Sequence, residues 1–120
     1  MRGTLRVIST PASKKAHRLI ELRQVPTLSI LRDIVGGELQ LLDDFDTILH
    51  GGQAVSCKVF CRRMPDENSP NVFANMLWTQ AMIRKHGFSE TTVPHMLTGP
   101  VAVLFGDQEF LEAINFGRPF

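Results

Sequence analysis

The stretch PTLSILRDIVGGELQLL, residues 26–42, has the pattern of a helix followed at once by a strand. Thr27 suits the N-cap, because its hydroxyl can accept a hydrogen bond from an N–H of the first helical turn. One helical face then carries four apolar residues, Leu28, Leu31, Ile34 and Val35. Gly36 or Gly37 supplies the left-handed residue that closes many helices. The sequence therefore predicts a helix that ends at the glycine pair and a strand over 38–42.

The glycine pair also raises the question of a phosphate-binding loop. Such loops run from a strand into a helix, because the helix N-terminus supplies free N–H groups to the anion. Here the order is helix, glycines, strand, and neither G-x-G-x-x-G nor G-x-x-x-x-G-K-[ST] occurs in the chain. We therefore interpret Gly36-Gly37 as a helix cap and turn.

Further strands are predicted outward from this segment. Alternating or β-branched apolar residues predict strands over 4–9 and 54–60, and the apolar run 99–107 predicts a buried central strand. Residues 17–24 suit a strand or a short helix, and Pro26 favours the strand because it disfavours a helical residue before it. The intervening residues 43–52 are expected to form a looser segment.

A second main helix is predicted after the polar loop 62–70. Ser69 at the N-cap with Pro70 at the first helical position is a strong start signal, and Gly87 ends the helix. Its apolar stripe consists of Phe73, Ala74, Leu77, Trp78 and Ala81. Trp78 is expected to be mostly buried, with its indole N–H bonded to a backbone or water acceptor.

Together these elements, with a short terminal helix within 107–116, predict one α+β domain over residues 1–120. We expect a mixed sheet of about five strands with two main helices on one face. No apolar run approaches the ~18 residues that span a bilayer, and the N-terminus lacks the apolar region of a signal peptide. The sequence therefore predicts a cytoplasmic protein without a membrane partner.

Charge is unevenly distributed although the formal net charge is only +1. Residues 1–32 carry seven basic groups and one acid, whereas residues 33–46 carry five acids and no base. Such asymmetry marks either an anion- or partner-facing surface or simply solvated faces. Lys14, Lys15 and Arg18 are the candidate binding residues of the basic segment.

Two further sets of polar residues are candidates for ligand binding. A local basic cluster consists of Lys58, Arg62 and Arg63. Phe60 and Trp78 are nearby aromatic residues on which a nucleic-acid base could stack, although Trp78 lies on the apolar stripe. Asn71 and Asn75 lie one helical turn apart, where they either bind a ligand or make local structural contacts.

The sequence predicts no metal, cofactor or catalytic centre. Cys57, Cys61 and the four histidines match no usual zinc spacing. On a strand the two cysteines share one face and lie ~13 Å apart, which exceeds the roughly 7 Å limit of a disulfide. The acidic run Asp43, Asp44 and Asp46 has too few ligands for an EF-hand, so a solvated loop is expected.

Three segments match a known pattern in order and spacing over residues 18–112. They are PTLSILRDIVGGELQLL, NVFANMLW with Asn71, Ala74 and Leu77 in N-x-x-A-x-x-L, and LTGPVAVLFGD. Together they resemble a small uncharacterised (domain-of-unknown-function) family of bacteriophages, conjugative plasmids and bacteria. That family usually has an Asn-Glu-x-Gly turn before the main helix, whereas residues 61–70 here read CRRMPDENSP, without glycine.

The resemblance implies a compact α+β accessory protein of a mobile element and no particular chemistry. We therefore expect a non-enzymatic protein that binds a host protein in the bacterial or infected cell, such as an inhibitor of a defence or restriction system. The alternative is a nucleic-acid or nucleotide-binding module that uses the basic N-terminal segment, in which Arg2 and Arg6 join Lys14, Lys15 and Arg18, together with Arg62 and Arg63.

Overall fold

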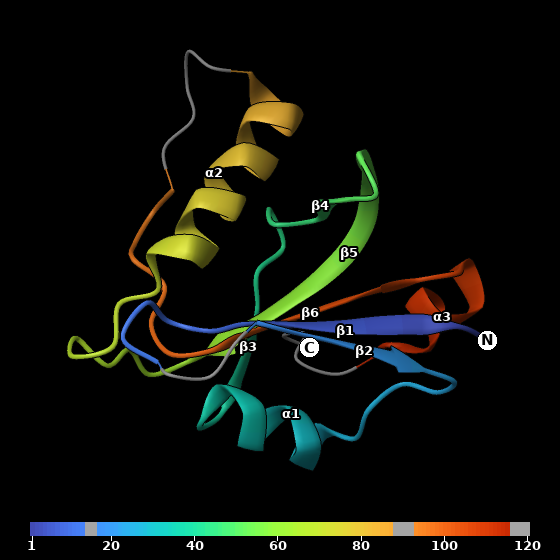
Figure 1. The fold of residues 1–120 in the computed structure, drawn as a ribbon, viewed down its shortest axis with the longest axis horizontal. Coiled ribbons are helices and arrows are strands. Elements are labelled where there is room, and N and C mark those ends of the chain that lie inside the picture. The colour runs from blue at the N-terminus through green and yellow to red at the C-terminus, as the bar shows by residue number, and fades with distance from the viewer. Residues whose placement is uncertain (14–16, 88–92, 116–120) are drawn as a thin grey trace.

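The computed structural model describes residues 1–13, 17–87 and 93–115 and has the α+β fold expected from the sequence (Figure 1). In chain order its elements are β1 (Gly3–Ile8), β2 (Arg18–Leu22), α1 (Leu28–Val35), β3 (Leu39–Leu41), β4 (Thr47–His50), β5 (Gln53–Arg62), α2 (Val72–His86), β6 (Val101–Gly106) and α3 (Gln108–Ala113). Within the described residues, no helix is long and apolar enough to cross a bilayer.

The strands form a sheet in the order β2-β1-β6-β5-β3, and β4 pairs with β5 off this path. Every pairing between these strands is antiparallel, so the expected mixed sheet was wrong. The reason lies in the chain that follows α2. It returns to the start of that helix, where the Asn71 N–H donates to the Leu97 carbonyl at 2.8 Å. β6 therefore begins at the sheet end where β5 finishes, and the two strands run in opposite directions.

The two main helices lie on opposite faces of the sheet, not on one face as expected (Figure 1). Trp78 of α2 belongs to one hydrophobic core and Leu31 of α1 to the other. Because side chains alternate along a strand, Val59 and Phe60 of β5 contribute to different cores. The five buried residues at the start of β6 are the pattern of a strand covered on both faces.

The segment 43–52, expected to be loose, contains a strand. β4 pairs with the first half of β5 across a turn in which Gly51 and Gly52 have φ of 60° and 80°. Two successive positive φ angles are typical of the tight hairpin turns that follow the twist of the strands. The sequence analysis therefore missed the short strand before these glycines.

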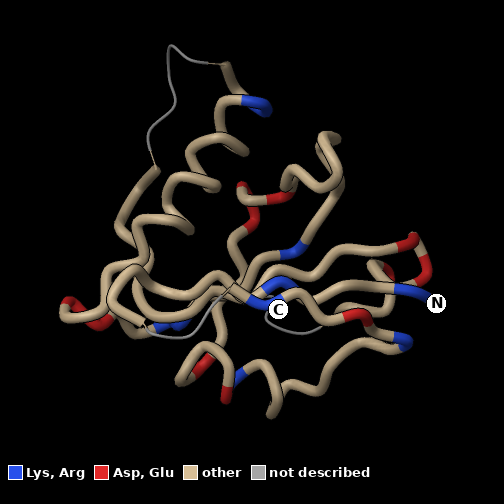
Figure 2. The backbone as a smooth tube through the Cα atoms, viewed as in Figure 1, with Lys and Arg blue, Asp and Glu red and all other residues tan. Residues whose placement is uncertain are grey.

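Between β3 and β4 the chain bulges away from β5. The Leu42 N–H donates to the Val59 carbonyl and the Asp46 carbonyl accepts from the Cys57 N–H, both at 2.9 Å. The bulged residues include Phe45, which is fully buried. The acidic run around the bulge meets the basic end of α2 (Figure 2), where Lys85 Nζ lies 3.3 Å from Asp44 Oδ1 and 3.1 Å from Asp46 Oδ2.

α1 begins and ends as the sequence predicts. Thr27 Oγ1 accepts a hydrogen bond from the Ile30 N–H at 3.3 Å. Gly36 closes the helix with a φ of 84°, and its N–H donates to the Arg32 carbonyl at 2.8 Å. Leu31 and Val35 are fully buried, whereas the other two residues of the predicted face are half-buried.

α2 begins two residues later than its start signal suggested, so the Ser69-Pro70 prediction was wrong. Asn71 is the N-cap, and its Oδ1 accepts from the Ala74 N–H at 3.1 Å. Pro70 instead lies in an isolated antiparallel bridge with Thr98. Asparagine is at least as good an N-cap as serine, and here it is also held by contacts from distant segments.

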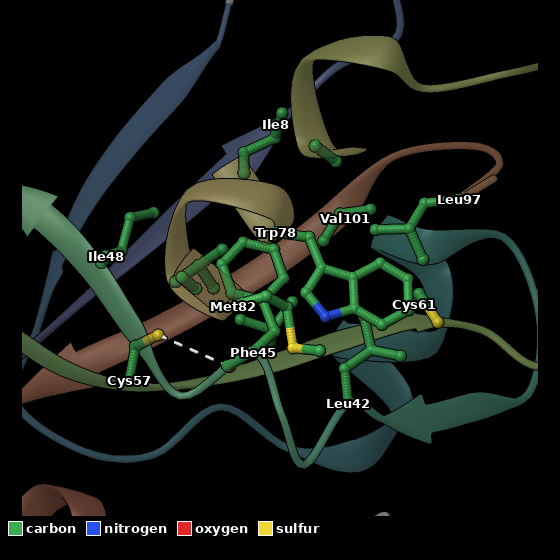
Figure 3. Close-up of a cluster of buried hydrophobic side chains, with 14 of the residues drawn as sticks. Ile8, Leu42, Phe45, Ile48, Cys57, Cys61, Trp78, Met82, Leu97 and Val101 are labelled. Atoms are coloured by element: carbon green, nitrogen blue, oxygen red, sulfur yellow. Dashed lines mark hydrogen bonds between the residues drawn. The ribbon is translucent and has the colours of Figure 1, made fainter. Parts of the chain in front are cut away.

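The apolar stripe of α2 differs from the predicted one at its edges. Ala74, Trp78 and Ala81 are buried as expected, but Met82 is buried too and Phe73 is 40% exposed. Trp78 is 3% exposed and stacks on Phe45, with ring centroids 6.5 Å apart (Figure 3). Its Nε1 is buried and has no hydrogen-bond partner among the described residues, so the expected backbone acceptor is not found there.

Candidate functional site

Arg62, a predicted binding residue, lies at the end of β5 and connects several segments. Its Nε donates to the Val35 carbonyl at 3.0 Å, where a cation also suits the negative end of α1. Its Nη1 lies 3.7 Å from Asp66 Oδ2 in the loop before α2. The side chain is only 21% exposed. Arg62 therefore acts mainly as a structural tie between the strand, the helix end and the loop.

Two glycines with positive φ make room for this guanidinium. Gly36 has φ 84° and Gly99 has φ 69°. A Cβ atom at Gly36 would collide with Nη2 of Arg62, and one at Gly99 would lie 3.1 Å from the same nitrogen. Gly36 thus provides the predicted cap and also space for Arg62, a second role that the local sequence did not indicate.

The side-chain amide of Asn71 is fully engaged in hydrogen bonds that support the fold. It is fully buried, and its Nδ2 donates to the Ile8 carbonyl at 2.9 Å and to the Gly99 carbonyl at 2.8 Å. Together with the cap at Ala74, these bonds use every donor and one acceptor position of the amide. A ligand at Asn71 would have to displace one of them.

Asn75, one turn further along α2, holds the same returning chain. Its Oδ1 accepts from the Leu97 N–H at 2.6 Å, and its Nδ2 donates to the His95 carbonyl at 3.2 Å. The pair Asn71 and Asn75 thus fastens the chain before β6 to the start of α2. The sequence left open whether Asn71 and Asn75 bind a ligand or make structural contacts. In the structure the side chains of both residues make structural contacts.

Arg62 and Arg63 come together at a small pocket of about 240 Å³, whose lining includes Cys61 and His95. Burial raises the pKa of the Cys61 thiol to about 11. The thiol is therefore protonated at neutral pH, which makes it a poor nucleophile. Arg63 is exposed, so its guanidinium could bind an anion here, but the Cys61 thiol of this pocket is not activated as a nucleophile.

Cys57, the other thiol, is more strongly suppressed. Burial, helped by the negative charge of Asp46, raises its pKa to about 12. Its Sγ donates to the Phe45 carbonyl at 3.8 Å. Both cysteines are free and buried, as expected for core residues on one strand face. Within the described ranges, no group of three or more His, Cys, Asp or Glu residues could hold a metal ion.

The remaining predicted binding residues lie apart from this pocket. Lys58 is on the opposite face of β5 from Cys57, and its Nζ donates to the Ile114 carbonyl at 3.3 Å. Arg18 lies on β2 at the edge of the sheet. Lys14 and Lys15 fall outside the described residues. The six predicted residues that the structure describes thus do not converge on one site.

An apolar groove of about 440 Å³ between β2 and α1 is a further candidate surface, which the sequence analysis did not predict. Its apolar lining includes Leu5, Ile20, Leu22, Val25, Ile30 and Ile34. Ile20 is 37% exposed and Ile30 is 49% exposed. Arg18 and Asp33 are its charged lining residues. We call this surface the β2–α1 groove.

The groove exists because α1 does not cover the whole sheet. α1 packs over β3, β5 and β6, so the neighbouring face of β2 stays partly open beside it, whereas Leu5 and Val7 of β1 are buried. The signal in the sequence was Ile30, an apolar residue of α1 that lies off its predicted buried face. Its significance required knowing which strands α1 covers.

The described basic residues of the N-terminal segment do not share one face of the sheet. β1 and β2 pair with Val7 opposite Arg18 and with Arg6 opposite Leu19. Arg6 and Arg18 therefore project from opposite faces, since neighbouring positions on a strand alternate. Arg32 is paired with Glu38 at 3.1 Å. Among the described residues, Arg6, Arg18 and Arg23 make no ion pair.

Comparisons with protein-family models, curated proteins and solved structures gave no match. The resemblance described from the three sequence segments therefore stays a prediction.

Proposed function

We propose that this chain is a small non-enzymatic accessory protein of a phage or mobile element that binds a host protein through the β2–α1 groove. The observation that carries the proposal is the open apolar surface on which Ile20 and Ile30 are partly exposed. A contiguous apolar patch with charged residues at its border is typical of a protein-interaction site. Inhibition of a host defence or restriction system in the cytoplasm is one form of this activity.

The non-enzymatic part of the proposal is supported by the reactive groups. Both thiols are buried, and their raised pKa values keep them protonated at neutral pH. Arg62, Asn71 and Asn75, three of the predicted binding residues, are engaged in structural contacts. Catalysis normally needs a nucleophile or base with a suitable pKa and free geometry, and these residues do not supply one.

The nucleic-acid alternative is weakened by the arrangement of the basic residues. A nucleic-acid backbone is held by cations that follow one groove or face. Here Arg6 and Arg18 project from opposite faces of the sheet, and Arg62 donates a hydrogen bond to the Val35 carbonyl. The mostly apolar lining of the β2–α1 groove does not favour charged phosphate groups, whereas it can pack against the apolar side chains of a protein.

The proposal is tested by capture with matched variants. Tagged wild-type chain is exposed to extracts of bacterial hosts, and each captured protein is purified and titrated against the wild type, Ile30→Glu and Met76→Glu. Met76 is the control, since it is 58% exposed on α2, away from the groove. Both variants replace an exposed apolar residue by the same acid, so melting curves should show similar folding.

We expect the host protein to bind wild type and Met76→Glu equally and to bind Ile30→Glu about tenfold or more weakly. Equal binding by both variants would remove the groove from the function. Tight binding of single-stranded DNA, duplex DNA or RNA oligomers that weakens steeply with salt would replace the proposal with the nucleic-acid alternative.

A further inference from the structure

β2 gives the sheet an open edge. Among the described residues it pairs only with β1, and in an antiparallel pair every second residue directs its N–H and C=O away from the partner strand. The register with β1 continues over five residues without a bulge, and β2 contains no proline. Edge strands are usually shortened, bulged or covered, because open ones pair with other chains.

The other strands with an open edge, β3 and β4, are shortened or covered. β3, at the opposite edge, has only three residues. β4 is covered near its start by α2, where Arg84 Nη2 donates to the Thr47 carbonyl at 3.0 Å. β2 lacks both devices within the described structure, so its outward-facing backbone groups are available to an added strand.

The side chains of β2 are apolar on both faces at the middle of this edge. Leu19 is 61% exposed on the α2 side of the sheet, and Ile20 is 37% exposed beside the β2–α1 groove. A strand added to β2 would place one of its residues next to Leu19 and the adjacent residue next to Ile20. Two consecutive apolar residues would therefore cover both.

The same edge carries uncompensated positive charge. Arg6 lies opposite Leu19 on β1, Arg18 begins β2 and Arg23 follows it, and Glu21 is the one acid on these two strands. None of the three arginines makes an ion pair among the described residues. A segment with acidic residues on either side of its apolar pair complements this pattern.

We infer that β2 accepts an extended acidic–apolar segment of the host protein as an added strand, with its apolar pair covering Leu19 and Ile20. This inference rests on the proposed function and specifies its mode of recognition. In strand addition the backbone hydrogen bonds supply affinity, and the alternate side chains supply specificity. The added strand also borders the β2–α1 groove through the residue beside Ile20.

A second copy of this chain fits the edge less well. Antiparallel pairing of β2 with itself must keep residues of one sheet face together. In the registers with most overlap, Arg18 then faces Ile20 or Leu22 of the second copy, and two positively charged edges meet. An acidic segment removes this repulsion, which favours a different protein as the occupant.

The experiment selects a random linear peptide library against the intact chain and then synthesises the enriched peptide as the probe. Each backbone nitrogen of the probe is N-methylated in turn, and affinities are measured by fluorescence anisotropy. The protein variants are Leu19→Glu and the double variant Arg18→Glu with Arg23→Glu. Their controls are Leu49→Glu, which changes a 47% exposed leucine of β4, and Arg63→Glu at an exposed arginine away from β2.

We expect enriched peptides with two adjacent apolar residues flanked by Asp or Glu. N-methylation should abolish binding at every second position only, because alternate N–H groups face β2. The β2 variants should weaken binding about tenfold or more, and the controls should leave it unchanged. Melting curves of all variants confirm that the fold is retained.

Several results would overturn the inference. They are a library without enriched peptides, N-methyl effects without a two-residue period, equal effects of the β2 variants and their controls, and a dimer that Leu19→Glu dissociates. The proposed function is judged separately with the captured host protein. If Ile30→Glu abolishes its binding and Leu19→Glu does not, the function stands and strand addition is wrong.

Discussion

Replacement of Gly36 by alanine tests whether the glycine serves both the helix end and Arg62. The residue has φ 84°, a conformation that costs an alanine about 1–2 kcal/mol. The new Cβ would also collide with Nη2 of Arg62 and push the guanidinium away from the Val35 carbonyl, to which Nε now donates at 3.0 Å. A hydrogen bond from a charged donor contributes about 1.5–3 kcal/mol.

Gly36→Ala should therefore lower the free energy of unfolding by about 3 kcal/mol, the sum of backbone strain and most of the lost bond. The ion pair of Arg62 with Asp66 adds little, because the two side chains are 21% and 39% exposed. The neighbouring Gly37 is the matched control. Its φ is not positive, and a Cβ there would meet Arg62 Cγ at 3.5 Å, an ordinary contact.

The assay is urea unfolding followed by the fluorescence of Trp78, the single tryptophan. Gly37→Ala should change the free energy of unfolding by less than about 1 kcal/mol, because alanine mainly restricts the unfolded chain there. In an Arg62→Ala background, Gly36→Ala should cost only the backbone strain of about 1–2 kcal/mol. The difference between the two backgrounds measures the coupling between Gly36 and Arg62.

Two results would refute this reasoning. Equal effects of Gly36→Ala and Gly37→Ala would show that the left-handed cap is misassigned. An undiminished cost of Gly36→Ala in the Arg62→Ala background would show that the glycine does not make room for the guanidinium.

Three further predictions concern the core. Trp78→Ala should destabilise by about 3–5 kcal/mol, and Trp78→Phe by less than half of that, because phenylalanine keeps most of the buried ring; efficient acrylamide quenching of the native emission would contradict this burial. Asn71→Ala should cost about 3–5 kcal/mol through the lost cap and two unsatisfied carbonyls, and a change below 1 kcal/mol in urea unfolding would be incompatible with its bonds. Cys57 and Cys61 have folded pKa values of about 12 and 11 against 9.0 for an ordinary thiol. The thiols of the unfolded state therefore ionise first, so the free energy of unfolding should be constant below about pH 9 and fall as the pH rises towards these values. Urea midpoints that stay constant from pH 8 to about 10.5 would contradict the burial of the two thiols.

Features that depend on near neighbours in the chain were readable from the sequence. Both ends of α1 belong to this class, because Thr27 bonds to Ile30 and Gly36 bonds to Arg32, three and four residues away. The shared core face of the two cysteines follows from strand alternation alone. Such features need no knowledge of the tertiary fold.

Features that depend on distant segments were not readable. Ser69-Pro70 is a good local start signal, but Asn71 caps α2 and is also fixed by carbonyls of Ile8 and Gly99. Arg62 looked like a ligand-binding cation because its contacts at Val35 and Asp66 come from segments that fold beside it. In both cases long-range hydrogen bonds decide the role of a residue whose local sequence favours another one.

The opposite placement of α1 and α2 was the one long-range feature with an available signal. The apolar run of β6 already indicates a strand covered on both faces, which requires layers on each side of the sheet. For the β2–α1 groove the sequence offered only Ile30, an apolar residue off the predicted buried face of α1. The groove arises because α1 leaves the face of β2 partly uncovered, and sequence periodicity indicates what a helix buries but not which strands it covers.

The position of β1 has a consequence for the order in which the chain folds. β1 lies between β2, which follows it closely in the chain, and β6, which begins only at Val101. During synthesis the β1–β2 hairpin therefore waits for residues 23–100 before β6 is made, and an isolated two-stranded hairpin is at best marginally stable. The hairpin made first should thus be among the last elements to become protected in pulsed hydrogen exchange, and early protection of the β1 amides would contradict this order. Until β6 arrives, both edges of the hairpin are exposed, so the nascent chain is most prone to pair wrongly at its N-terminal end.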